Sequence, residues 1–161
     1  MKVIIISGTP GTGKSSLAKL IEKKTNFKTL DFKKILKENK LNETYDAKRK
    51  CYVVNIKKLN KILVQIIKNF KNNLIIDSHL GHFFPKKYAN LCIITKCNLR
   101  ELKKRLIKRK YNKLKIKENL ECEIFNVCLT ESQKLGHNIL IIDTTKGVKD
   151  LNIKKIISLC N

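Results

Sequence analysis

Two kinds of hydrophobic pattern alternate along the chain. Short continuous apolar runs, typical of strands buried on both faces, occur at 2–6, 73–77, 91–95 and 139–143, with a shorter one near 27–30. Between them, apolar residues recur every three or four positions, which predicts helices at 14–24, 31–40, 55–70, 98–110, 118–135 and 149–159. Buried strands that alternate with helices predict a parallel sheet covered on both faces, and hence a three-layer α/β sandwich.

The junction between the first strand and the first helix reads GTPGTGKS, residues 8–15, and holds three of the six glycines in the chain. It matches the phosphate-binding loop G-x-x-x-x-G-K-[ST], and its flanks supply the order of strand, loop and helix that this motif needs. Lys14 would reach the β- and γ-phosphates of a nucleoside triphosphate, and the Ser15 hydroxyl would ligate Mg²⁺. The backbone N–H groups that would surround the phosphates belong to Gly11, Thr12, Gly13, Lys14, Ser15 and Ser16.

A carboxylate near the Mg²⁺ would complete this chemistry, and two apolar strands end in one. Asp77 ends the run LIID and Asp143 ends ILIID, so both are candidates to hold a metal-bound water, with Asp77 preferred. His79 lies two residues beyond Asp77, on the same side of an extended chain, and would orient water or phosphate there. A structural or solvated histidine is the alternative interpretation.

Arginine is rare in this lysine-rich chain, and three of the four arginines fall in one stretch, at positions 100, 105 and 109. Arg105 and Arg109 are one helical turn apart, so both guanidinium groups would face one polyanion. A guanidinium offers a planar fork to phosphate oxygens, which predicts a lid that contacts the transferred phosphoryl group. A solvated basic helix is the alternative.

The length of 161 residues indicates one domain, spanning 1–161. No apolar stretch reaches 18 residues and no signal peptide is visible, so we expect an intracellular protein without a membrane segment. The six cysteines lack C-x-x-C spacing, which favours reduced thiols over disulfides or zinc ligands.

The formal net charge of +23 permits two interpretations. Clustered basic residues bind RNA or other acidic partners by releasing counterions. However, lysines are spread through every segment and are accompanied by abundant asparagine and isoleucine, which also indicates a compositional bias toward AT-rich codons.

Taken together, several stretches resemble one known family. These stretches are ISGTPGTGKSSLAK, YD at 45–46, DSHLGHFFP at 77–85, RLIKRKYNKLKIKENLECEIF at 105–125 and IDTT at 142–145. They are similar to the atypical adenylate kinases, which include the archaeal "putative adenylate kinases" and the eukaryotic adenylate kinase isoenzyme 6, also called coilin-interacting nuclear ATPase. The resemblance covers nearly the whole chain in order.

The resemblance implies a P-loop kinase fold with a five-stranded parallel sheet, a nucleoside-monophosphate-binding segment at about 30–53 and a short lid at about 108–118. It implies ATP contacts at the loop residues already named and at Arg109 in the lid. Together with the candidates already identified from the residues, the side chains expected to act on the phosphates are Lys14, Asp77, His79, Arg105 and Arg109, with Ser15 and Asp77 toward Mg²⁺, partly through water.

The resemblance also implies a function, namely transfer of the γ-phosphate of ATP to AMP, with ATPase activity beside it. It further implies a role in small-subunit ribosome maturation, through a platform protein of that subunit and pre-ribosomal RNA. The location would be cytoplasmic, or nuclear in a eukaryotic source. Two alternatives remain open: a ribosome-assembly ATPase with incidental kinase activity, and a kinase of the same architecture that prefers CMP.

Overall fold

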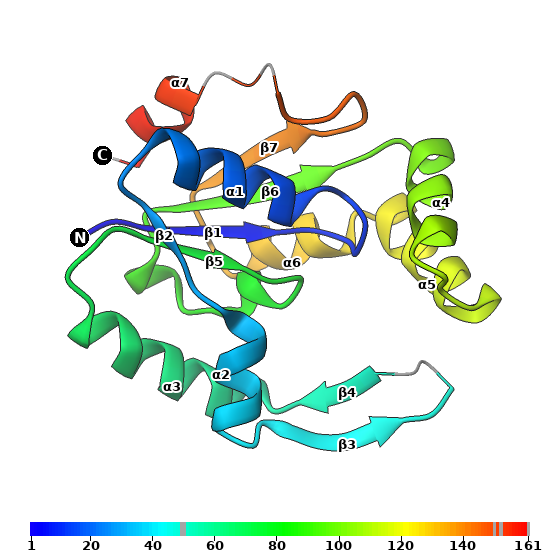
Figure 1. The fold of residues 1–161 in the computed structure, drawn as a ribbon, viewed down its shortest axis with the longest axis horizontal. Helices are drawn as coiled ribbons and strands as arrows, with labels where there is room; N and C mark the ends of the chain where they lie inside the picture. Colours follow the sequence, from blue (N-terminus) through cyan, green and yellow to red (C-terminus); the bar gives the residue numbers. More distant parts are fainter. Residues whose placement is uncertain (49–50, 150, 152, 161) are drawn as a thin grey trace.

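A five-stranded parallel sheet forms the centre of the computed structural model, which describes residues 1–48, 51–149, 151 and 153–160 (Figure 1). The strands follow the order β2-β5-β1-β6-β7. Their bounds are β1 (Val3–Ser7), β2 (Lys28–Thr29), β5 (Leu74–Asp77), β6 (Leu91–Lys96) and β7 (Ile139–Asp143). Helices lie on both sides of this sheet, so the predicted three-layer α/β fold is confirmed.

The central strand β1 shows why its sequence is apolar without interruption. Ile4 and Ile6 pack on one face with α1 (Lys14–Lys24) and α7 (Ile153–Ser158). Val3 and Ile5 pack on the other face with α3 (Ile56–Asn69). A strand covered on both faces needs apolar side chains at odd and even positions alike. The strand therefore holds the loop that follows it on a rigid base.

Helix boundaries follow local capping signals. The side chain of Asn55 accepts the Lys58 N–H at the start of α3, and Asn98 caps α4 (Leu99–Lys108) in the same way through Glu101 N–H. Asp31 caps the short helix α2 (Phe32–Glu38). Such caps satisfy N–H groups that the helix itself leaves unpaired.

The single helix predicted at 118–135 is wrong. The structure has two helices there, α5 (Lys113–Ile124) and α6 (Val127–Lys134), separated by Asn126 in the left-handed backbone region with φ of 51°. Helix α5 also begins five residues earlier than predicted, inside the expected lid at 108–118. Apolar spacing continues across the break, which is why the periodicity did not reveal it.

A two-stranded antiparallel hairpin, β3 (Asn42–Asp46) and β4 (Cys51–Val54), is absent from the sequence prediction. It lies within the predicted monophosphate-binding segment and extends away from the central sheet (Figure 1). Asn112, at the start of α5, donates its side-chain N–H to the carbonyl of Lys48 at 3.2 Å. The hairpin tip therefore touches the turn between α4 and α5.

The predicted helix at 149–159 is shorter in the structure, as α7, and residues 150 and 152 of that prediction lie outside the described part of the chain. Two 3₁₀ turns, η1 (Gly81–Phe83) and η2 (Lys86–Tyr88), connect β5 to β6. Among the described residues, no helix combines the length and apolarity needed to cross a membrane.

Candidate active site

The loop between β1 and α1 has the backbone of a phosphate cradle. Gly8, Gly11 and Gly13 all adopt positive φ, at 135°, 95° and 87°. A Cβ added to Gly8 would stand 2.6 Å from the carbonyl oxygen of Thr95, so a side chain fits neither the conformation nor the space there. The three glycines that were predicted to bend the loop do so at positive φ, where a side chain would be strained.

Threonines support the loop from beneath. The Thr12 hydroxyl lies 2.7 Å from the Thr9 carbonyl and 2.6 Å from the Thr95 hydroxyl, and all three residues are buried. Thr144, which follows β7, donates its hydroxyl to the Thr12 carbonyl at 2.6 Å. Contacts from β6 and from the end of β7 thus hold the loop before any ligand binds.

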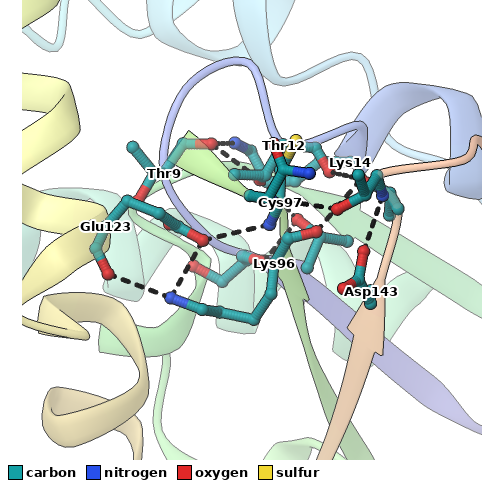
Figure 2. Close-up of polar contacts among 12 residues, drawn as sticks. Thr9, Thr12, Lys14, Lys96, Cys97, Glu123 and Asp143 are labelled. Carbon is teal, nitrogen blue, oxygen red and sulfur yellow. Dashed lines mark hydrogen bonds and ion pairs between the residues drawn. The ribbon is translucent and has the colours of Figure 1, made fainter. Parts of the chain in front are cut away.

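A buried carboxylate, Glu123, joins this support from α5 (Figure 2). It accepts the Thr9 hydroxyl at 2.6 Å and the Cys97 N–H at 3.1 Å, and it pairs with the Lys96 ammonium at 2.9 Å. Every oxygen of this carboxylate is therefore engaged, as a buried charge requires. Residue-by-residue analysis missed Glu123, although it lies within the ECEIF stretch of the family resemblance.

Lys14 lies half-buried at the start of α1, and its ammonium donates to the carbonyls of Gly8 at 2.8 Å and Thr9 at 3.0 Å. Burial lowers the pKa of Lys14 to about 8, and the negative charge of Asp77 partly counteracts this. The ammonium therefore sits at the loop, where it would meet bound phosphates. The next two residues, Ser15 and Ser16, are exposed in the first turn of the helix.

The two candidate aspartates have different surroundings. Asp77 ends β5, the neighbour of β1, in register with Ile6, and its charge acts on Lys14. Asp143 ends β7, two strands from β1, and its carboxylate accepts the Thr145 N–H at 2.6 Å. Hydrogen bonds from the side chain and then from the backbone of Thr145 lower the pKa of Asp143 and hold its carboxylate in its own turn. The geometry therefore favours Asp77.

His79 follows Asp77 and presents an exposed side chain. Loss of hydration beside the surrounding protein is the main cause that lowers the pKa of His79 to about 4. The positive charge of Lys14 is the second cause of this lowered pKa. The imidazole is neutral at pH 7, so it can accept or donate a hydrogen bond.

The two arginines that were predicted to face one polyanion have different surroundings. Arg105 donates to the carbonyls of Thr144 and Thr145, at 2.8 and 3.0 Å, and to the Glu101 carboxylate at 3.0 Å. It also approaches the Gly11 carbonyl at 3.5 Å, so it ties the loop to the segment after β7. Arg109 is exposed where α4 ends, and its charge reaches Lys14.

Comparisons with known proteins agree with this geometry. A family model described as an AAA domain matches residues 4–126. The chain is 35% identical to a "Putative adenylate kinase" from Methanocaldococcus jannaschii, over 88% of this chain and 76% of that protein. It is 31% identical to "Adenylate kinase isoenzyme 6 homolog" from Caenorhabditis elegans, over 97% of this chain and 87% of that protein. It is also 30% identical to "Adenylate kinase isoenzyme 6 homolog FAP7" from Saccharomyces cerevisiae, over 96% and 80%.

Two solved structures share the fold at low sequence identity. The YorR protein from Bacillus subtilis superposes with a TM-score of 0.63 at 17% identity, covering 98% of this chain and 95% of that one. Deoxyadenosine kinase from M. mycoides gives a TM-score of 0.53 at 19% identity, with the same coverage. Since the loop, the sheet order and the relatives agree, the chain belongs to the family of adenylate kinase isoenzyme 6 homologs and putative adenylate kinases, and it is an adenylate kinase-like nucleotide kinase.

Proposed function

We propose that this protein transfers the γ-phosphate of ATP to AMP, hydrolyses ATP in a slower side reaction, and acts in maturation of the small ribosomal subunit. The observation that carries the kinase proposal is the arrangement at the end of β1. There the glycine-bent loop and the Lys14 ammonium lie beside Asp77 on the neighbouring strand. Phosphoryl transfer depends mainly on positioning and on charge neutralisation, and these groups supply both.

The residues present fit a magnesium nucleotide. The three glycines let the loop adopt positive φ and pack closely against Thr95, Leu102 and Thr144, where a Cβ would collide. Oxygen ligands of the kind that Mg²⁺ prefers stand at Ser15 and Asp77. Ser15 and Asp77 would hold the ion, partly through water. When bound, the ion neutralises charge on the phosphates.

The chain's own groups have distinct tasks in this proposal. The N–H groups of residues 11–16 bind the phosphates, and Lys14 leaves its carbonyl partners to follow the β- and γ-phosphates. The exposed Arg109 reaches the transferred group from the lid turn. His79, as a neutral imidazole, orients the attacking water when hydrolysis occurs. Arg105 acts at a distance by holding Gly11 and the segment at 144–145 in place.

An acceptor screen with labelled ATP tests the proposed reaction. Each of AMP, CMP, GMP and UMP is offered with Mg²⁺, and a sample without acceptor reports hydrolysis. Fast ADP formation with AMP alone is the expected result. A preference for CMP would make CMP the acceptor in place of AMP. A rate of ADP formation that is the same with and without an acceptor would leave only the ATPase alternative.

The proposed ribosomal role rests on the family resemblance and on the net charge of +23. A platform protein of the small subunit and pre-ribosomal RNA are the partners, in the cytoplasm or, in a eukaryotic source, the nucleus. Binding to purified pre-ribosomal particles should weaken steeply as salt rises, because phosphate contacts release counterions, while ATP turnover changes much less. If binding to these particles does not depend on the salt concentration, or if no binding occurs at low salt, the codon-bias interpretation of the charge is favoured.

A further inference from the structure

A chain of three hydrogen-bonded side chains adjoins the start of the phosphate loop; two of them are buried, and 39% of the side chain of the third, Glu131, is exposed. The Ser7 hydroxyl lies 2.7 Å from Nδ1 of His82, and Nε2 of the same ring lies 2.8 Å from the Glu131 carboxylate. Ser7 has no exposed surface and His82 has 2% of its surface exposed. The three residues come from β1, η1 and α6, and we call them the Ser7–His82–Glu131 chain.

The hydrogen bonds define which atom carries each proton. An ionised carboxylate only accepts hydrogen bonds, so Nε2 of His82 carries the proton toward Glu131. In a neutral ring Nδ1 is then an acceptor, and the Ser7 hydroxyl donates to it. Burial is the main cause that lowers the pKa of His82, against the opposing effect of Glu131, and the nearby charges of His137 and Lys14 lower it further.

This chain meets the catalytic elements at two points. Ser7 directly precedes Gly8, the first residue of the loop, and His82 lies in η1, three residues after His79. The carbonyl of His82 accepts a hydrogen bond from the His137 ring at 2.8 Å. One imidazole therefore connects the start of the phosphate loop to the turn that carries His79.

That turn packs closely against β1. The Gly81 N–H donates to the Ser78 carbonyl at 2.9 Å, and a Cβ added to Gly81 would stand 2.9 Å from the side chain of Ile5. The turn follows directly after Asp77, so its position sets where Asp77 and His79 stand relative to the loop. Errors of about 1 Å at such a site can cost about 10²-fold in rate.

Serine, histidine and glutamate in a line also occur in hydrolases, where the serine attacks the substrate. Here Ser7 is closed off beneath the loop, so no substrate reaches its hydroxyl. We propose that His82 is a positioning residue for phosphoryl transfer: Glu131 orients its ring, and Nδ1 fixes Ser7 and with it the loop and the Asp77–His79 turn. This inference rests on the proposed kinase function.

Two conservative variants of His82 test the hydrogen bonds of Nδ1 and Nε2 separately. Asparagine places a polar atom near the position of Nδ1, and glutamine places one near that of Nε2. His82→Asn therefore keeps an acceptor for Ser7 and loses Glu131, whereas His82→Gln keeps Glu131 and loses Ser7. We expect His82→Gln to lower kcat for AMP-dependent transfer about tenfold, with KM for ATP within about twofold, and His82→Asn to retain about half of wild-type kcat.

Ser7→Ala and Glu131→Ala complete the test, and they decide it if His82→Gln does not fold. Ser7→Ala should lower kcat as much as His82→Gln does, and the double variant should lose no more than either single one. Glu131→Ala should lower kcat about threefold, because the ring keeps its burial but loses its orientation. Gln133→Ala, an exposed change on the same helix, is the matched control and should behave as wild type.

Several results would overturn the inference. These are unchanged kcat in folded His82→Gln and Ser7→Ala, equal loss in the asparagine and glutamine variants, or additive losses in the double variant. A merely structural role would lower the melting temperature and leave kcat unchanged below it. Failure of the proposed function is a separate result, since wild type would then show no transfer to AMP.

Discussion

The phosphate loop and the segment at about 30–53 form two sides of the proposed active site, and their construction differs. Thr9 and Thr12 of the loop are buried, with hydrogen-bond partners on α5, on β6 and after β7. In the hairpin β3–β4, Tyr45 and Tyr52 face each other across the strands with 56% of each residue exposed. The hairpin tip touches the rest of the protein through Asn112, at the lid turn.

This difference indicates that the phosphate loop is preorganised and that the hairpin β3–β4 is adaptable. Donors fixed before binding need no reorganisation when charge develops on the phosphates, which is why the loop is built into the core. A segment with few buried contacts opens at low free-energy cost and can close on an acceptor. In the proposed function, the loop would therefore define the chemistry, and the segment at about 30–53 would define which nucleotide enters.

The largest expected effect is on the donor side. Lys14→Ala removes the mobile cation that follows the phosphates and leaves the backbone donors in place, so phosphoryl transfer should fall about 10²-fold or more. Initial rates with AMP, together with circular dichroism to confirm the fold, provide the measurement. Lys24→Ala, an exposed lysine in the last turn of α1, serves as the control. Wild-type rates in a folded Lys14→Ala protein would contradict the assignment of Lys14 to the phosphate site.

The contacts of Glu123 with the phosphate loop should contribute to the free energy of unfolding. Glu123→Ala removes the carboxylate that pairs with Lys96 and accepts the Cys97 N–H, while Lys96 keeps its hydrogen bond to the carbonyl of residue 123. We expect the free energy of unfolding to fall by about 3 kcal/mol. Denaturant titration measures it. Glu121→Ala, whose carboxylate meets Lys117 at 3.9 Å on the surface, should change stability by less than about 0.5 kcal/mol. Equal effects of the two variants would show that Glu123 does not hold the loop.

Lys14 should also control the alkaline limb of the pH profile. Its pKa of about 8 means that the free enzyme loses this cation as the pH rises above 8, so kcat/KM for ATP should fall about tenfold per pH unit there. Bound phosphates favour the charged form, so kcat should fall at higher pH than kcat/KM does. Asp77→Asn removes a charge that raises this pKa and should move the limb to lower pH. A limb that stays in place would exclude Lys14 as its origin.

Asp77 and His79 should respond differently to mutation. Asp77→Asn should depress transfer and hydrolysis together, because both reactions need the charge on the β-phosphate neutralised. His79→Ala should lower ATPase activity more than transfer to AMP, by at least several-fold in their ratio, because orienting water matters most when water is the acceptor. Both rates are measured on one preparation. Equal losses would make His79 a support of the turn rather than a group that orients water.

The smallest expected effect is on the acceptor side. Tyr52→Ala removes one ring of the cross-strand aromatic pair, which has its centroids 5.1 Å apart. Such a pair stabilises a hairpin by about 0.7 kcal/mol, so KM for AMP should rise about threefold while KM for ATP stays unchanged. Steady-state titration of each nucleotide separates the two. A rise in KM for ATP alone would remove the hairpin from the acceptor side.

Local sequence predicted most of the framework. The five strands and the helices α1 and α3 appear close to where the apolar pattern placed them, because burial on one or both faces leaves a mark on consecutive residues. The phosphate loop was predictable for the same reason, since all of its special backbone requirements fall within eight residues. The hairpin was not, because strands of four and five residues that lie largely on the surface leave too little apolar alternation to detect.

Contacts between residues far apart in the chain were decided only by the tertiary structure. Thr9 meets Glu123 across 114 positions and Ser7 meets His82 across 75. Arg105 belongs to the predicted phosphate-binding pair, and in the folded protein its guanidinium also donates to the backbone carbonyls of Thr144 and Thr145 after β7. Periodicity reports which side of an element is buried, but it does not report which polar group will meet another there, because that depends on how separate elements pack. The amino-acid sequence by itself thus determined the sheet, the loop and the donor chemistry, whereas packing alone selected the partners that hold them in place.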